Sequence, residues 1–122
     1  MKKPNGYICF LSLVEILQAK SKIRTLDSTE KNLLNNIMLD DSVGHPIFVG
    51  DLLRLNLLGS KATLHGRLKN LKSIGYIKLI EQDDARKKRV VPTNQAYKLF
   101  ELLSTCMTRA LKESESYFGI KG

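Results

Sequence analysis

Apolar residues recur at steps of three and four along several stretches of the chain, a spacing that predicts amphipathic helices. The first helix is expected over residues 7–20, with Asn5 as its cap. A second begins in LDSTEKNLL, where Asp27 takes the N-cap position and Glu30 completes a capping box. Its buried stripe is expected to be Leu33, Leu34, Ile37 and Met38. The pattern then stops at DDSVGHP, which predicts a break in the helix.

Two shorter helical patterns meet across residues 56–59 in GDLLRLNLLGSKATLHGRLKNLKSIGY. Ser60 is expected to cap the second of them, and Gly75 to end it in the left-handed conformation. The apolar positions expected to face the core are Leu64, Leu68 and Leu71. Two helices joined by a tight turn are typical of the helix-turn-helix motif.

Short β-rich runs flank this motif. IFV, at residues 47–49, is long enough only for a short strand, whereas YIKLIE and KRVVP on either side of QDDARK predict a hairpin with the basic run 86–89 at its tip. Thr93 then caps a long helix expected from about residue 94 to 115. The apolar seam of that helix, spaced as in helices that pack on other helices, is Ala96, Phe100, Leu103, Met107 and either Ala110 or Leu111.

In this order the elements predict an α+β chain, mostly α: a winged helix-turn-helix with N- and C-terminal dimerisation helices. We expect a single winged-helix domain over residues 1–122. Residues 1–24 would hold the N-terminal helix, 25–92 the winged helix-turn-helix core and 93–122 the C-terminal helix. The apolar edges of the two terminal helices have two interpretations. They form a homodimer interface, which we favour, or they pack on each other within a monomer.

Positive charge is concentrated in one part of the chain. The formal net charge is +8, and between Arg54 and Arg89 ten basic residues stand against three acidic ones. The two flanking segments together are nearly balanced. A polyanionic partner is therefore expected for the central segment, with nucleic acid favoured over an acidic membrane surface.

Patterns that indicate other activities are missing from the sequence. GSKAT lacks the spacing of a phosphate-binding loop and no Ser-His-Asp pattern indicates catalysis, so we expect neither an enzyme nor a cofactor or metal site. Cys9 and Cys106 have neither the spacing of a zinc site nor the density of a disulfide scaffold, and their redox activity stays open. No segment reaches the ~20 apolar residues of a membrane span. We expect a cytoplasmic protein without a membrane partner.

The chain resembles the MarR family of bacterial transcriptional regulators from about Leu26 to Thr105. LDSTEKNLL is similar to the capped second helix of that family, and VGDLLRLNLLGSKATLHGRLKNLKSIGYI to its DNA-reading pair of helices. The hairpin follows the family's wing signature, with Asp84, then Arg86 two residues later, then Thr93 seven residues after that. The resemblance implies a dimer whose binding to DNA is controlled by a small-molecule effector.

Candidates for contact with DNA lie in the helix-turn-helix and in the wing. In the helix-turn-helix they are Arg54, Ser60, Lys61, Ala62, Thr63, His65 and Lys69. In the wing they are Asp84, Arg86, Lys87, Lys88 and Arg89. The helix would reach base edges in the major groove, while Arg86 enters the minor groove, held by Asp84, and the other wing cations bind phosphates. For Ser60, capping of the helix is the favoured role. For the basic run, the alternative is a solvated surface without a DNA contact.

These patterns predict a sequence-specific regulator, a repressor, that binds double-stranded DNA as a homodimer. Two alternatives remain open. A nonspecific architectural protein would use the same basic face on any duplex, and an adaptor would use the winged helix to contact other proteins. Gly66 interrupts the reading helix at a cost of about 1 kcal/mol relative to Ala, either because DNA approaches closely there or because the cost is tolerated.

Overall fold

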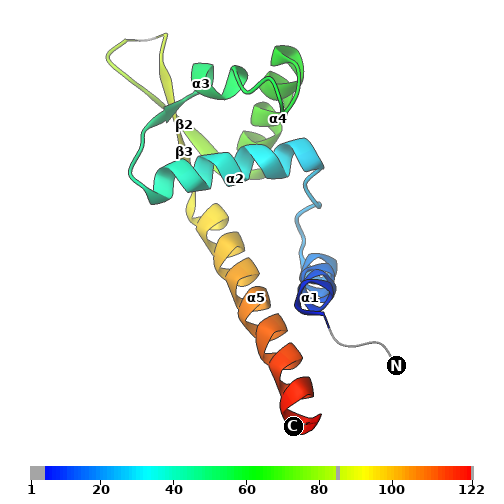
Figure 1. Ribbon diagram of the computed structural model, residues 1–122. Helices are drawn as coiled ribbons and strands as arrows, with labels where there is room; N and C mark the ends of the chain where they lie inside the picture. Colours follow the sequence, from blue (N-terminus) through cyan, green and yellow to red (C-terminus); the bar gives the residue numbers. More distant parts are fainter. Residues whose placement is uncertain (1–4, 85, 122) are drawn as a thin grey trace. The chain divides into compact units, whose positions relative to one another are not determined.

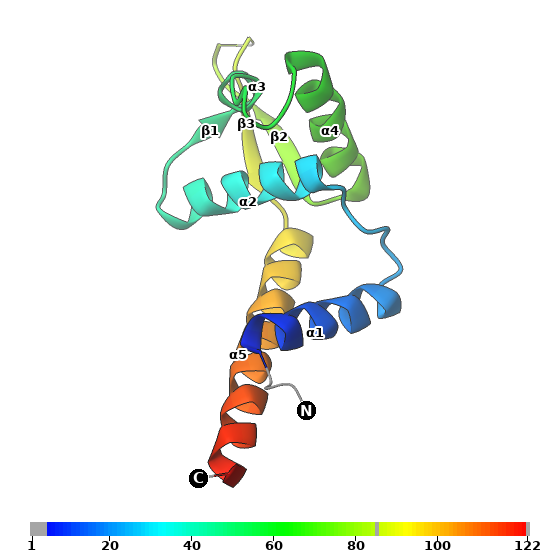
Figure 2. The same ribbon diagram turned by 45° about the vertical axis from the view of Figure 1, so that its right-hand side comes forward.

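The computed structural model describes residues 5–84 and 86–121, with side chains as far as residue 114. Residues 1–4, 85 and 122, which the predicted domain boundaries include, lie outside the described part. The chain forms two compact units. The winged unit comprises residues 26–97, and the helical unit comprises the segments 1–25 and 98–122. Figures 1 and 2 label their helices and strands.

Helix α2 (Ser28–Ser42) starts at the predicted capping box. The Asp27 carboxylate accepts a hydrogen bond from the Glu30 N–H at 2.8 Å, and the Glu30 carboxylate accepts one from the Asp27 N–H at 2.9 Å. Leu33, Leu34 and Ile37 are buried as predicted, whereas Met38 is only half-buried. The helix also continues through residues 40–42, past the predicted break, because a polar residue on an exposed last turn costs a helix little.

Helices α3 (Val49–Leu53) and α4 (Lys61–Ile74) form the predicted helix-turn-helix. Val49, expected in the strand, instead begins α3. Ser60 caps α4 and Gly75 ends it with φ 100°, a left-handed conformation that favours glycine. The leucines predicted to face the core are fully or almost fully buried: Leu64, Leu68 and Leu71. Figure 1 shows α2 (cyan) passing beside α4 (green) and the hairpin.

Strands β1 (Ile47–Phe48), β2 (Ile77–Glu81) and β3 (Lys88–Pro92) form an antiparallel sheet in the order β1-β3-β2. Val90 of β3 is opposite Ile47 on one side and Leu79 on the other. The buried residues Ile47, Ile77 and Val90 share one face of this sheet, since opposite residues of neighbouring strands point the same way. The other face carries exposed side chains, among them Ile80 and Arg89, and the half-buried Phe48 and Val91.

The base of the hairpin is closed by Thr93. Its hydroxyl donates to the carbonyl of Gly75 at 2.6 Å, and its backbone N–H donates to the carbonyl of Tyr76 at 3.0 Å. The same hydroxyl accepts a long hydrogen bond, 3.4 Å, from the N–H of Ala96, so Thr93 also caps α5 (Asn94–Lys121) as predicted. Nearby, the hydroxyl of Tyr97 donates to Asp41 of α2. This hydrogen bond, with smaller contributions from burial and the Asp41 charge, raises the pKa of Tyr97.

In the helical unit, Asn5 caps α1 (Gly6–Lys20) as predicted, accepting hydrogen bonds from the N–H groups of Tyr7 and Ile8. In the second half of α5, the predicted seam residues differ in burial. Cys106 and Ala110 are buried, whereas Met107 is exposed. Steps of four and three fit two adjacent rows on a helix, and the periodicity alone does not choose between them. Many apolar side chains of the unit stay exposed: Tyr7, Ile8, Leu11, Ile16, Leu102, Met107 and Leu111.

Candidate nucleic-acid interface

The side chains of α4 lie in three rows, because residues three or four apart share one side of a helix. The core row is Leu64, Leu68 and Leu71. The basic row, at steps of four, four and three and on the exposed surface, is Lys61, His65, Lys69 and Lys72. The tied row, in which every side chain is bound within the protein, is Thr63, Arg67 and Asn70. Ala62 and Gly66 lie between the basic and tied rows, away from the core.

The tied row binds α4 to the residues before it and to α2. The Thr63 hydroxyl accepts a hydrogen bond from the Ser60 hydroxyl at 2.9 Å. Arg67 Nε lies 2.7 Å from a carboxylate oxygen of Asp27, and the Asn70 amide donates to Glu30 at 3.0 Å. The positive charge that α4 presents freely to solvent therefore comes from the basic row.

Four of the predicted helix contacts, Lys61, Ala62, His65 and Lys69, are exposed. Thr63 is half-buried and already engaged with Ser60. Lys72 extends the basic row by one turn, although the sequence analysis did not select it. Lys61, His65 and Lys72 flank the leucine row, and Ala62 lies further round, on the side of α4 away from its leucines.

Gly66 has no packing reason to be glycine. It lies inside a regular helix, and a methyl group in place of its hydrogen would meet nothing within 4 Å. Alanine would therefore fit and would favour the helix.

Arg54 follows α3 on the turn that leads to α4. Its guanidinium lies 3.3 Å from a carboxylate oxygen of Asp51, whose other oxygen accepts a hydrogen bond from the Phe48 N–H at 3.0 Å. The Arg54 side chain is nevertheless exposed. It both braces α3 and remains accessible from outside.

The four consecutive basic residues of the hairpin do not form one patch. The predicted strand KRVVP is confirmed, since β3 spans Lys88–Pro92, and the prediction of the whole basic run at the tip is therefore wrong for Lys88 and Arg89. Strand alternation sends these two side chains to opposite faces of the sheet. Lys88 is opposite Glu81, which offsets its charge locally, while Arg89 is flanked by Phe48 and Ile80.

Arg86 is an almost fully exposed cation of the hairpin, with a side chain 96% exposed. The Asp84 carboxylate accepts a hydrogen bond from the Arg86 backbone N–H at 3.1 Å, whereas Arg86 Nε lies 3.9 Å from the same oxygen, beyond hydrogen-bond range. The Asp84 carbonyl also accepts from the Lys87 N–H at 2.9 Å. Asp84 therefore orders the backbone of the turn and leaves the guanidinium of Arg86 free to move.

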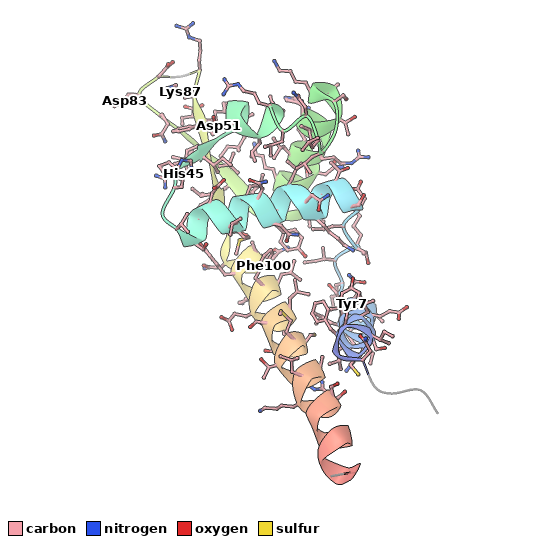
Figure 3. All side chains as sticks on the ribbon, in the orientation of Figure 1. Tyr7, His45, Asp51, Asp83, Lys87 and Phe100 are labelled. Carbon is pink, nitrogen blue, oxygen red and sulfur yellow. The ribbon has the colours of Figure 1, made fainter. Side chains whose placement is uncertain are left out.

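Lys87 has a partner of its own. Its ammonium lies 5.9 Å from the centre of the Phe48 ring, within the range of a cation–π contact. Figure 3 shows Asp83 and Lys87 at the end of the hairpin, with Asp51 closer to the sheet. The contact ties the hairpin loop to the residue that precedes α3.

The winged unit has a shallow hollow lined by residues that include Asp41, His45, Arg89 and Val91. Its volume is about 20 Å³, enough for one or two water molecules and too small for an organic effector. Within residues 5–84 and 86–121, no cluster of three His, Cys, Asp or Glu side chains could hold a metal ion. No helix in that part of the chain is both long and apolar enough to cross a membrane.

Solved structures with the same architecture are regulators of transcription. Transcriptional regulator Tm0710 from Thermotoga maritima superimposes with a TM-score of 0.69 at 18% identity, over 90% of this chain and 72% of that one. A mutant of S. aureus MepR bound to an oligodeoxyribonucleotide gives 0.61 at 17%, over 96% and 75%. A MarR-like regulator of Thermotoga maritima, tm0816, gives 0.57 at 16%, over 92% and 82%. No protein-family profile and no curated protein matches the sequence.

The chain has the MarR-like winged-helix fold. The predicted fold class is thereby confirmed, including the helices on both sides of the winged core. At such low identities the likeness establishes the fold alone, so the roles of individual residues in the MarR-like fold are argued from this chain's own geometry.

Two features of this MarR-like fold escaped the sequence analysis. The bonds from Arg67 and Asn70 to α2 join residues about 40 positions apart, and no local pattern signals them. The capping box predicted the first partner of Glu30 and gave no sign of the second. Phe48 was expected only as part of a short strand, yet it contacts Lys87 and helps to start α3.

Proposed function

We propose that this chain is a sequence-specific transcriptional regulator that binds double-stranded DNA, with α4 in the major groove and the hairpin tip in the flanking minor groove. The observation that carries the proposal is the basic row of α4 together with Arg86, an exposed cation on the hairpin loop. The major groove of B-DNA admits one α-helix, and narrow A/T-rich minor grooves attract arginine. A DNA-bound MepR mutant among the similar structures supports the same partner.

Within the major groove, the basic row supplies the direct contacts. Lys61 and His65, near the start of α4, are placed for base edges, where they would bond guanine acceptors. Lys69 and Lys72, further along the helix, would bind phosphates. Ala62 and Gly66 have small side chains, so the DNA can approach the helix closely beside the basic row. Ser60 and Thr63 lie at the start of α4, where the backbone N–H groups favour anions such as phosphate.

In the hairpin, Arg86 is the residue that enters the minor groove. Asp84 shapes the turn that carries it. Lys87 and Arg89 share the face that holds Phe48, so they approach phosphates on one side, and Lys88 acts opposite Glu81 on the other. Arg54 contacts the DNA backbone from the turn before α4.

The proposed regulator acts in the cytoplasm as a homodimeric repressor. The exposed apolar residues of α1 and α5 support the dimer, since a helical unit seldom leaves so many apolar side chains in water. The two copies of α4 would then occupy major grooves about 10 base pairs apart. A small-molecule effector follows only from the resemblance, and its site lies elsewhere than the 20 Å³ hollow of the winged unit.

The deciding experiment is selection of binding sites from random duplex DNA, followed by affinity measurements across salt concentrations. We expect a two-fold symmetric motif and a steep salt dependence, because each neutralised phosphate steepens the slope of log K against log salt by about 0.9. Tight binding without a motif would point to an architectural protein instead. An absence of binding even at low salt would reject the proposal and leave the adaptor.

Charge-removing variants localise the interface. Lys61→Ala and Lys69→Ala should each weaken binding, whereas Lys112→Ala, an exposed lysine of α5 with no polar contact in the described residues, is the control of equal charge. Equal losses from all three variants would mean that net charge, and no particular surface, binds the DNA.

A further inference from the structure

The side chain of Glu30 connects the start of α2 to α4. One of its carboxylate oxygens accepts from the Asp27 N–H at 2.9 Å, and the other accepts from the Asn70 amide at 3.0 Å. Asp27 in turn pairs with Arg67 at 2.7 Å. Two neighbours on one side of α4 are thus bound to the first turn of α2. We call Asp27, Glu30, Arg67 and Asn70 the polar clamp.

Burial makes this arrangement costly if its only purpose is to cap a helix. Glu30 is 0% exposed. A buried carboxylate must recover its lost hydration through hydrogen bonds, and apolar replacements of buried charged groups are often as stable or more so. Capping α2 needs only one carboxylate oxygen and works equally well at the surface. The second oxygen is bound to α4 instead, at a position 40 residues further along the chain.

Apolar packing alone leaves the rotation of α4 loosely defined. The core rows of α2 and α4 consist of leucine and isoleucine side chains, and hydrophobic burial is non-directional, so it favours contact between the helices without fixing one rotation. Hydrogen bonds are directional, and the Asn70–Glu30 hydrogen bond, with the ion pair of Arg67 and Asp27 beside it, holds the side of α4 that carries the tied row. Base contacts in turn require their side chains to be held within roughly 10–20°.

We propose that the polar clamp sets the rotation of α4 about its own axis, and that Glu30 and Asn70 are positioning residues for base recognition. This inference rests on the proposed function. Neither residue contacts DNA in this scheme. Their effect reaches the bases through the orientation of Lys61, His65 and Lys69.

Asn70→Ala tests the clamp with no change of charge. Affinity is measured for the selected site and for random duplex of equal length, and the ratio of the two reports base recognition. We expect the ratio to fall at least about fivefold, the effect of one mismatched base pair or more, with affinity for random duplex within about twofold of wild type. Asn35→Ala, on an exposed position of α2, is the matched control and should leave the ratio unchanged. Circular dichroism verifies that each variant is folded at the assay temperature.

A second set of variants exchanges donor and acceptor in the hydrogen bond between residues 30 and 70. Asn70→Asp places a carboxylate against that of Glu30 and should lower the ratio further. Adding Glu30→Gln gives a double variant in which the new amide donates to the carboxylate introduced at position 70 while its oxygen still accepts from the Asp27 N–H, at the wild-type net charge. We expect this double variant to recover at least half of the lost ratio on a logarithmic scale. If Asn70→Ala proves unfolded, this comparison decides alone.

The outcomes separate the two proposals. A wild-type protein without a preferred site rejects the proposed function, and the clamp with it, before any variant is made. A selective wild type with an equally selective Asn70→Ala variant overturns the clamp alone. So does an equal loss on both DNAs, which indicates a general structural role, and so does a double variant that recovers nothing.

Discussion

Helix α4 and the hairpin both present cations to solvent, but they are held in different ways. α4 is fixed on two sides, by a row of buried leucines and by the tied row that bonds to α2 and Ser60. The hairpin loop is held by a turn at Asp84 and by the contact of Lys87 with Phe48. The Nε of Arg86, an almost fully exposed cation, lies beyond hydrogen-bond range of Asp84. The difference fits the two tasks of the proposed function, since reading bases demands a fixed orientation whereas a minor groove is found by shape and charge.

The largest effect is expected when a buried leucine that holds α4 on the core is removed. Leu64→Ala deletes a fully buried side chain and should lower the free energy of unfolding by about 2–5 kcal/mol. Chemical denaturation followed by circular dichroism measures this change. Leu57→Ala, on a fully exposed position of the turn before α4, is the matched control and should change stability by less than about 0.5 kcal/mol. A similar loss for both variants would show that burial is not what holds α4.

Arg86→Ala probes the opposite case, a residue that matters for DNA and not for folding. We expect a loss of about 1–3 kcal/mol in binding free energy for the selected site, with the melting temperature unchanged. Fluorescence anisotropy with labelled duplex measures the affinity. Lys112→Ala controls for the loss of one positive charge. Unchanged affinity would exclude the hairpin tip from the interface.

Gly66→Ala tests whether α4 has a glycine at this position for contact with DNA or merely tolerates it. Because the added methyl group has open space, we expect the free energy of unfolding to rise by roughly 1 kcal/mol, as measured by thermal or urea denaturation. The affinity of the same variant for DNA then decides between the two explanations of this glycine. Weaker binding at higher stability indicates a close approach of DNA, and unchanged binding indicates tolerance. A loss of stability would contradict the open space around Gly66.

The smallest effect is expected where Lys87 meets Phe48. In a double-mutant cycle of Lys87→Ala and Phe48→Leu, the coupling energy for folding should be about 0.5–1 kcal/mol, the strength of an exposed cation–π contact. Both single variants and the double are compared by urea denaturation. Strict additivity would mean that the ring and the ammonium are near each other without interacting.

Local signals in the sequence predicted most of the elements because their causes are local. Ser60, Gly75 and the Asp27–Glu30 box each act within one turn, so residue type and spacing suffice to identify them. The leucines of α4 follow from a single periodicity. The choice of Cys106 over Met107 for the buried side of α5 depends on tertiary packing, which the periodicity does not contain.

The candidate site was predicted less completely. The helical spacing predicted the basic row of α4 from Lys61 to Lys69. Lys72 follows the same spacing but was not among the predicted contacts. The sequence placed Lys88 and Arg89 in the strand run KRVVP, in which alternation separates the two side chains, yet it also grouped both with the tip of the hairpin. Asn70 lies on a helix surface like any polar residue, and only the folded chain brings it to Glu30.

The paired hydrogen bonds of Thr93 to Gly75 and Tyr76 close the hairpin at its base. Changes in the loop between β2 and β3 are thereby isolated from the end of α4 and the start of α5. A hairpin whose loop is lengthened or exchanged would keep the same hydrogen bonds at its base. In the proposed function, evolution or an engineer could therefore exchange this loop and change its contact with the minor groove without changing α4.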